Sequence, residues 1–199
     1  MAAPGKLALL VIDAQVALLD PRHAYRADAV VEAIEALLRA ARRHGIPRIF
    51  VQHDGKRGAW IHEPGWEIHP RLQPQPDEPV IHKRASDSFY ETALEAELRS
   101  RGVDRLIVVG CQTPYCVDTT SRRAVSLGFN VWLVEDAHTT DDQGLLSPEA
   151  IIRHHNFVLD GFGTERASIA VLSSDEVLKR LTSGAGDASP KTFTRGDET

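Results

Sequence analysis

Short apolar stretches alternate with amphipathic ones along the chain. Six stretches are apolar and short enough to be strands: residues 6–12, 48–52, 79–82, 105–109, 130–134 and 168–172. The first is almost continuously apolar, as in a strand that is buried on both faces. The remaining pattern predicts helices over residues 26–44, 90–101, from 114 or 115 to 127, 147–159 and 174–181. Gly45, Gly102 and Gly128 favour the ends of the first three helices.

Strands that alternate with helices form parallel βαβ units with right-handed crossovers. We therefore expect an α/β fold, a three-layer α/β/α sandwich around a central six-stranded parallel sheet. Residues 1–183 are predicted to form a single domain, and the polar stretch 184–199 a disordered tail. Ligands of such sheets bind outside the carboxyl ends of the strands, so functional residues should directly follow strands.

Composition narrows the class of protein. Of the 199 residues, 42% are hydrophobic and 26% are charged, which is typical of a globular domain. The formal net charge of −5, without a basic stripe, makes nucleic acid or an anionic membrane a poor candidate partner. No apolar run approaches the roughly 20 residues of a membrane span, and residues 7–12 are too short for a secretory signal. We expect a cytoplasmic protein that binds a small molecule.

The chain has two cysteines, Cys111 and Cys116, which form neither a disulfide framework nor a metal knuckle. Cys116 falls in the first turn of a predicted helix, directly after a strand and a tight turn. The free N–H groups there should lower the pKa of a thiol and could bind a developing oxyanion. On this spacing alone, a nucleophile and a thiol that only packs against the sheet are equally well supported.

Two further polar residues end predicted strands. Asp13 directly follows the first strand and Lys83 follows the third. Each has an ordinary interpretation, a turn residue for Asp13 and a solvated side chain for Lys83. Together with Cys116 they could meet at one edge of the sheet. The carboxylate would then accept the thiol proton and pass it to a leaving amine, while the ammonium stabilises both anions.

Five segments in this order resemble the isochorismatase-like cysteine hydrolases. They are LLVIDAQ with Asp13, PGWEIHP over 64–70, VIHKRASDSFYET with Lys83, VVGCQTPYCVDTTSRRA with Cys116, and VWLVEDAHTT over 131–140. The similarity runs from about Leu7 to Leu181. The family includes nicotinamidases, ureidoacrylate and biuret amidohydrolases, and streptothricin-type hydrolases.

The resemblance implies a catalytic triad of Asp13, Lys83 and Cys116. It also implies a cis peptide bond between Cys111 and Gln112, with Cys111 as a small residue at that bond. The backbone N–H groups of Gln112 and Cys116 would form the oxyanion hole. The implied reaction is hydrolysis of an amide-type C–N bond, in an amide, lactam or ureido compound, through a thioester intermediate.

One segment departs from the family pattern. Nicotinamidases carry D-x-H and two further histidines that bind a metal, whereas residues 53–56 here read HDGK. Asp54 stands at the aspartate, but Lys56 stands where a histidine is expected, and an ammonium is a poor metal ligand. His62 and His69 remain. We expect no metal and no cofactor, and hence no nicotinamidase activity.

The substrate pocket is less well defined by the sequence. Gln15, Trp60, Phe89 and Tyr115 are the candidate substrate-binding residues, because they lie near segments that should reach the site. Packing in the core or at an interface is the alternative for each aromatic residue. Trp66, Gln112 and His138 are further candidates. The resemblance also implies a homodimer or homotetramer.

Several other functions stay open at this point. The isochorismatase branch of the family would cleave a vinyl ether, but Cys116 and the absence of a second domain favour C–N hydrolysis. A non-catalytic ligand-binding member would have lost the triad. An unrelated flavoprotein or phosphatase lacks its phosphate-binding loop here, and disulfide exchange would need Cys111 as the second thiol. Among the family branches, streptothricin-hydrolase-like or general amidohydrolases are favoured.

Overall fold

The six predicted strands form one parallel sheet in the order β3-β2-β1-β4-β5-β6. A computed structural model describes residues 6–183. Its strands and longer helices are β1 (Lys6–Ile12), α1 (Ala27–Arg43), β2 (Arg48–His53), β3 (Val80–Lys83), α2 (Leu94–Ser100), β4 (Val103–Cys111), α3 (Asp118–Ser126), β5 (Asn130–Thr139), α4 (Pro148–Leu159), β6 (Ile169–Leu172) and α5 (Ser174–Ser183). The predicted fold class is confirmed.

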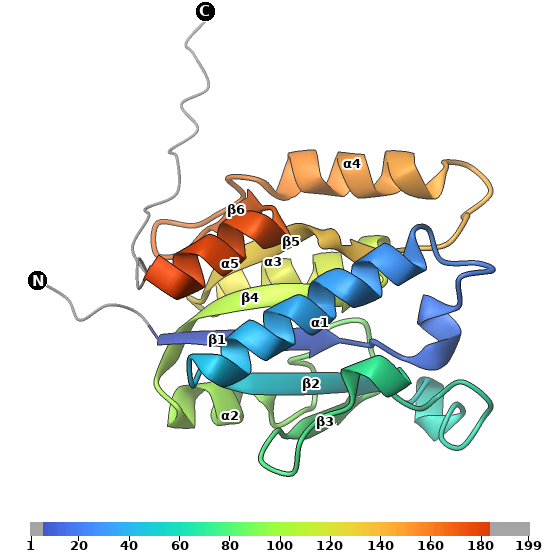
Figure 1. The fold of residues 1–199 in the computed structure, drawn as a ribbon, viewed down its shortest axis with the longest axis horizontal. Coiled ribbons are helices and arrows are strands. Elements are labelled where there is room, and N and C mark those ends of the chain that lie inside the picture. The colour runs from blue at the N-terminus through green and yellow to red at the C-terminus, as the bar shows by residue number, and fades with distance from the viewer. Residues whose placement is uncertain (1–5, 184–199) are drawn as a thin grey trace, which may run out of the picture.

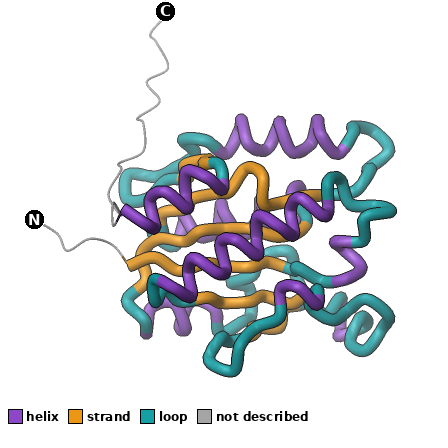
Figure 2. The backbone as a smooth tube through the Cα atoms, viewed as in Figure 1, coloured by secondary structure: helices purple, strands orange, loops and turns teal. Residues whose placement is uncertain are grey.

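Helices cover both faces of the sheet (Figures 1 and 2). Helices α1 and α5 lie in front of the strands in Figure 1, and α3 lies behind them. Strand β1 shows why its sequence is continuously apolar. Leu9 and Val11 pack into the cluster under α1 and α5, whereas Leu10 and Ile12 pack into the cluster formed with α2 and α3. Both faces of the strand are therefore buried, as the sequence predicted.

The strand order reverses between β1 and β4. The chain runs outward from β1 through β2 to β3, then returns to place β4 on the other side of β1. Sheets of this kind bind ligands at such a switch point. The segments that follow β1 and β4 begin here, because Ile12 is the register partner of Gly110. At the same edge His53 is the register partner of Lys83, so the ends of four strands converge.

Three predicted boundaries are wrong by more than two residues, each for a local reason. The helix predicted over 90–101 begins only at Leu94, since Glu91 has a φ of 53° that no α-helix accommodates. The strand predicted to end at residue 134 continues to Thr139 after a register shift opposite β4. The helix expected from residue 114 or 115 is divided into a π-helical turn, Thr113–Val117, followed by α3.

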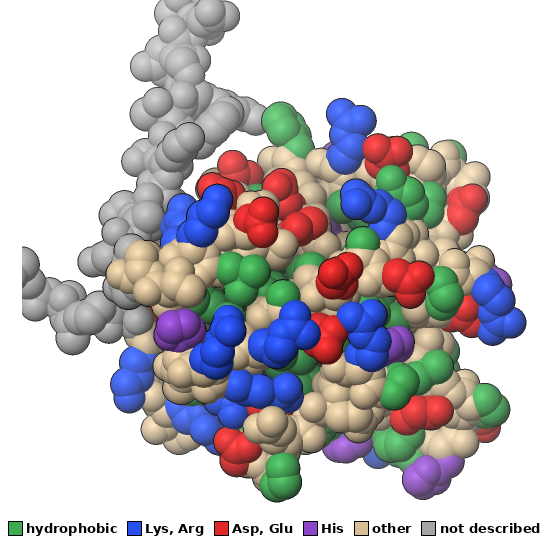
Figure 3. Space-filling model, in the orientation of Figure 1, with side chains coloured by type: hydrophobic (Ala, Val, Ile, Leu, Met, Phe, Trp, Pro, Cys, Tyr) green, Lys and Arg blue, Asp and Glu red, His purple; other side chains and the backbone are tan. Residues whose placement is uncertain are grey.

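The surface carries both signs of charge. Figure 3 shows basic and acidic side chains next to one another over the face that α1 covers, and Glu35 there pairs with Arg39 at 3.1 Å. Among the described residues, no helix has the length and apolar character needed to cross a membrane. The predicted tail, 184–199, lies outside the described residues. The predicted homo-oligomer remains a prediction.

Candidate active site

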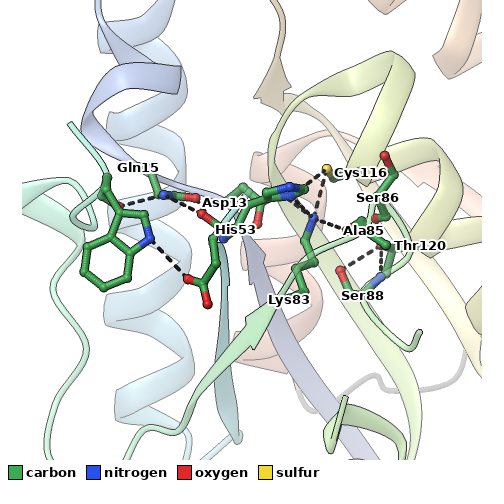
Figure 4. Close-up of polar contacts among 11 residues, drawn as sticks. Asp13, Gln15, His53, Lys83, Ala85, Ser86, Ser88, Cys116 and Thr120 are labelled. Atoms are coloured by element: carbon green, nitrogen blue, oxygen red, sulfur yellow. Dashed lines mark hydrogen bonds and ion pairs between the residues drawn. The ribbon is translucent and has the colours of Figure 1, made fainter. Parts of the chain in front are cut away.

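Asp13, Lys83 and Cys116 meet at the carboxyl edge of the sheet. Lys83 Nζ lies 2.7 Å from Asp13 Oδ2 and 3.0 Å from Cys116 Sγ. Figure 4 shows these side chains pointing toward one another from three separate segments. Asp13 and Lys83 are fully or almost fully buried, and Cys116 is 8% exposed. A carboxylate, an ammonium and a thiol therefore share one largely dry pocket, although they are far apart in the sequence.

His53 is a fourth side chain in this cluster, and sequence reasoning missed it. Its Nδ1 lies 2.9 Å from Lys83 Nζ, 3.8 Å from Asp13 Oδ2 and 3.9 Å from Cys116 Sγ. The signal was present in the sequence, because His53 directly follows the apolar stretch 48–52, as Asp13 follows the first strand.

The ammonium of Lys83 has three well-directed acceptors. It donates to Ala85 O at 3.0 Å and to Cys116 Sγ, and its third partner is His53 Nδ1. An ammonium has only three N–H groups. Asp13 thus interacts with Lys83 only through the attraction of their opposite charges. Neither of its carboxylate oxygens has a hydrogen bond of normal geometry to any described residue. The carboxylate keeps its lone pairs for a proton.

Backbone geometry places Asp13 and the nucleophile segment. Asp13 has a φ of 47°, and its N–H is held by Val51 O at 2.9 Å. Gly110 has a φ of 118°, and a Cβ there would lie 1.9 Å from Ile12 O, so that only glycine lets β4 pass this close to β1. The peptide bond between Cys111 and Gln112 is cis in the structure.

The free thiol of Cys116 is neutral at physiological pH. Burial, followed by the negative charge of Asp13, raises the pKa of Cys116 to about 12, although Lys83 acts in the opposite direction. The expectation of a lowered pKa from the sequence is therefore wrong. Cys116 lies in the π-helical turn before α3 and is only 8% exposed, and burial of this kind disfavours a thiolate.

A buried hydrogen-bond chain connects the nucleophile segment to α4. Thr113 Oγ1 and His138 Nδ1 are 2.9 Å apart, and His138 Nε2 lies 2.9 Å from Asn156 Oδ1. Because the amide oxygen of Asn156 only accepts, Nε2 carries the proton and Thr113 donates to Nδ1. Burial lowers the pKa of His138 to about 4, which keeps it neutral. The chain fixes the turn that carries Cys116.

The four predicted substrate-binding residues differ in position. Gln15 is buried and uses its whole side-chain amide on the backbone: it donates to His53 O and Trp66 O and accepts from His53 N–H. It therefore holds the loops around the site. Phe89 is 9% exposed and stacks on Phe129 at 6.0 Å, in the apolar cluster that also contains Cys116.

Trp60 and Tyr115 are the exposed members of the set. Trp60 is 45% exposed, and its ring lies 4.8 Å from the His53 ring. It packs closely on Gly55, where a Cβ would come within 2.8 Å of the indole. Tyr115 is 46% exposed and donates a hydrogen bond to Gln143 at 2.7 Å. Trp60 thus has free surface beside His53, and Tyr115 is an exposed ring one residue before Cys116 in the sequence.

Two cavities flank the cluster. One, of about 230 Å³, is lined by Gln15, Ala17, Leu18, Trp60, Glu63, Pro64, Gly65 and Trp66. The other, of about 260 Å³, is lined by Asp54, His82, Lys83, Arg84, Tyr90 and Glu91. The first is mainly apolar and the second mainly charged. A larger cavity, of about 290 Å³, lies between the start of α1 and α4 and contains none of the triad residues.

The cluster does not fit a metal ion. Asp13, His53 and Cys116 offer ligand atoms within 4.8 Å of one another. Their common neighbour, however, is Lys83 Nζ, at 2.7, 2.9 and 3.0 Å from one atom of each. The ammonium occupies the position that a cation would take, and its charge would repel one. The positive charge at this position is therefore that of the Lys83 side chain.

Asp54, the counterpart of a metal-binding aspartate in the family pattern, is also engaged. Its Oδ1 lies 3.0 Å from His82 Nδ1 and accepts from Trp66 Nε1 at 3.2 Å. His69 accepts from the Arg71 N–H, and His62 lies edge-on to Trp66. Neither histidine bonds Asp54, so these residues form a loop scaffold.

Comparison with known proteins identifies the family of this chain. A family model described as an isochorismatase domain matches residues 7–151. The chain belongs to the isochorismatase family. An isochorismatase from Pseudomonas putida is 32% identical, with a TM-score of 0.77 and coverage of 88% of this chain and 93% of that one. A cysteine hydrolase from Pseudomonas syringae is 26% identical, with a TM-score of 0.76 and coverage of 92% and 95%.

Among characterised relatives, a streptothricin hydrolase from Streptomyces noursei is 41% identical over 138 residues. That match covers 68% of this isochorismatase-family chain and 50% of the relative. The chain thus spans about half the length of the streptothricin hydrolases that it matches.

Proposed function

We propose that this protein is a cysteine hydrolase that cleaves an amide-type C–N bond of a small molecule. One observation carries the proposal: Asp13, Lys83 and Cys116 meet at the carboxyl edge of the sheet, where Lys83 Nζ lies 2.7 Å from Asp13 Oδ2 and 3.0 Å from Cys116 Sγ. Buried charges are rare unless paired, and here the paired carboxylate lacks directed hydrogen bonds. The streptothricin hydrolase likeness supports the same bond class.

In the first half-reaction, Cys116 Sγ attacks the carbonyl carbon while Asp13 takes the thiol proton. The carbonyl oxygen becomes an oxyanion, which the backbone N–H groups of Gln112 and Cys116 stabilise. The tetrahedral adduct then expels the amine, which receives the proton from Asp13. The product is a thioester on Cys116, and the C–N bond is broken. Oxyanion stabilisation in such sites is worth about 3–4 kcal/mol of the barrier.

In the second half-reaction, water attacks the thioester and Asp13 takes one of its protons. Collapse of the adduct releases the acid, and the proton returns from Asp13 to the sulfur. Amide and water are thus converted into acid and amine with the protein unchanged. Lys83 keeps its charge throughout and stabilises whichever of Asp13 and Cys116 is the anion.

We propose that the cavity of about 230 Å³ binds the part of the substrate that lies away from the scissile bond. The exposed face of Trp60 supports this, because an indole fixed on Gly55 is a ready stacking surface beside His53. The wall also contains Pro64 and Leu18. Such a lining suits a compact apolar or planar group.

The test is release of ammonia or amine from a panel of small amides, lactams and ureido compounds, with one vinyl ether included. Wild type is compared with Cys116→Ala, and Asp20→Asn serves as a control because Asp20 only pairs with the exposed Arg22. We expect release from at least one C–N substrate, unchanged in the control and lower by at least about 10³-fold in Cys116→Ala. Turnover that survives Cys116→Ala would contradict the mechanism, and turnover of only the vinyl ether would contradict the bond class.

A further inference from the structure

The hydrogen bond between Lys83 and His53 determines where the three N–H groups of Lys83 point. Two of them are directed to Ala85 O and Cys116 Sγ, and His53 Nδ1 at 2.9 Å receives the third. An ammonium donates and never accepts, so Nδ1 is an acceptor and the imidazole is neutral with its proton on Nε2. This assignment follows from the chemistry of the partner.

Asp13 is the group that would take the third N–H if His53 were absent. Its Oδ2 is only 2.7 Å from Lys83 Nζ, closer than any other partner, yet neither oxygen receives a directed hydrogen bond from the described residues. A carboxylate that accepts a charge-assisted hydrogen bond becomes a weaker base. His53 therefore accepts an N–H of Lys83 that would otherwise be donated to Asp13. Without that hydrogen bond, Asp13 stays a better acceptor of the thiol proton.

Other contacts hold His53 in this orientation. Its backbone N–H and carbonyl are both bonded to the Gln15 amide, at 2.9 and 3.2 Å. The Trp60 ring packs on the imidazole at 4.8 Å, and the side chain is only 14% exposed. The β2–β3 register places His53 directly beside Lys83. Figure 4 shows the ring between Gln15 and the triad.

We propose that His53 is a positioning residue of this site, which acts by accepting a hydrogen bond from Lys83 through Nδ1 and thereby keeps Asp13 free to deprotonate Cys116. The inference rests on the proposed function, since it assigns a role within the same centre. It makes a specific claim about one ring nitrogen. The oxygen of asparagine can occupy the position of Nδ1, whereas the longer glutamine places its amide at the position of Nε2.

The experiment measures the rate at which iodoacetamide alkylates Cys116, which requires no substrate. Wild type is compared with His53→Ala, His53→Asn and His53→Gln at several pH values between 7 and 10. Cys116→Ala identifies any labelling at Cys111, which is fully buried. His82→Ala is the matched control, because His82 is the histidine directly before Lys83 in β3, and its Nδ1 bonds Asp54 and not Lys83.

We expect alkylation to fall roughly tenfold in His53→Ala and His53→Gln, and to stay within about threefold of wild type in His53→Asn and His82→Ala. Alkylation at the wild-type rate in all three His53 variants would overturn the proposal. A loss of alkylation rate in His53→Asn as large as in His53→Ala would overturn it too. If His53→Ala does not fold, the contrast between asparagine and glutamine still decides. If this pattern appears but no amide is hydrolysed, the positioning role stands and the proposed function fails.

Discussion

Two buried charge clusters lie at opposite ends of β2 and β3, and they are built in opposite ways. At the amino end, Glu78 accepts hydrogen bonds from Arg42, from Arg48 and from the Gln75 N–H, all at 2.8–2.9 Å. At the carboxyl end, Asp13 lies beside Lys83 but receives no directed hydrogen bond. Both carboxylates are at most 4% exposed.

The two carboxylates differ in how many hydrogen bonds they accept, and this indicates a structural role for Glu78 and a reactive one for Asp13. Burial pushes the pKa of Glu78 up, but hydrogen bonds from Arg42, Gln75 and Arg48 outweigh it and bring the pKa down to about 2. This carboxylate is saturated and has nothing left to bind. The carboxylate of Asp13 is under-satisfied in a native core, where most polar groups find partners. We interpret the saturated cluster as a brace for α1 and the two strands, and the under-satisfied one as the reactive centre.

The largest expected effect is that of Asp13→Asn on turnover. The amide of asparagine cannot accept the thiol proton, so we expect kcat to fall about 10³-fold, within the range of general acid–base catalysis. The free energy of unfolding should also fall, because the buried ammonium of Lys83 loses its counter-charge, so kcat is compared below the melting temperature of the variant. Steady-state kinetics and thermal melts check both statements, and a loss of less than tenfold would contradict the role of Asp13 as proton acceptor.

For Glu78→Ala we expect the main effect on stability and not on turnover. This change leaves Arg42 and Arg48 without their shared partner and should lower the free energy of unfolding by about 3 kcal/mol. Asp77→Ala is the matched control: Asp77 also pairs with Arg48, at 3.1 Å, but its side chain is 72% exposed. It should cost less than about 1 kcal/mol. Urea unfolding measures both, and equal losses would remove the distinction between the clusters.

Acid should act on the Glu78 cluster in a defined pH window. The folded-state pKa, about 2, lies below the usual 4.5, so the unfolded chain takes up the proton first. The stabilisation is complete above pH 4.5 and is lost as the pH falls toward 2. Glu78→Gln should flatten this part of a stability–pH profile. A variant profile that parallels the wild type would contradict the assigned pKa.

A smaller effect is expected from the chain that fixes the nucleophile turn. Thr113→Val removes the donor to His138 and leaves a buried ring nitrogen unsatisfied, which should cost about 1–3 kcal/mol of stability. We expect kcat to fall about tenfold because the turn that carries Cys116 loosens. Thr92→Val, which removes a hydroxyl bonded to Ser88 O, is the control. If Thr113→Val lowers stability but leaves kcat unchanged, the chain is only structural.

Much of this site could be predicted from the sequence because parallel sheets gather the ends of their strands. Asp13 and Lys83 were identifiable as polar residues directly after apolar strands, and the same rule would have found His53. Backbone details were not predictable. The register shift that brings His138 beside Gly110 depends on pairing between β4 and β5, and the π-helical turn at Cys116 has no clear sequence pattern.

The predicted lowering of the Cys116 pKa was wrong because it also depended on a structural detail that the sequence does not show. A helix N-terminus favours a thiolate only while water and donors reach it, and burial was not visible in the sequence. Gln15 illustrates a related limit. It is a candidate substrate contact in the sequence because it lies near segments that reach the site, but only the structure shows that its amide bonds the backbone of His53 and Trp66.

The central claim is that Cys116 becomes acylated during turnover. It is tested most directly by quenching a hydrolysed amide or lactam in acid within the first turnovers, then measuring intact mass and mapping the peptide that carries the adduct. The account predicts the mass of the acyl group on the peptide containing Cys116, and no adduct in Cys116→Ala. Turnover that proceeds with no adduct on Cys116, at equal rates in both proteins, would contradict it.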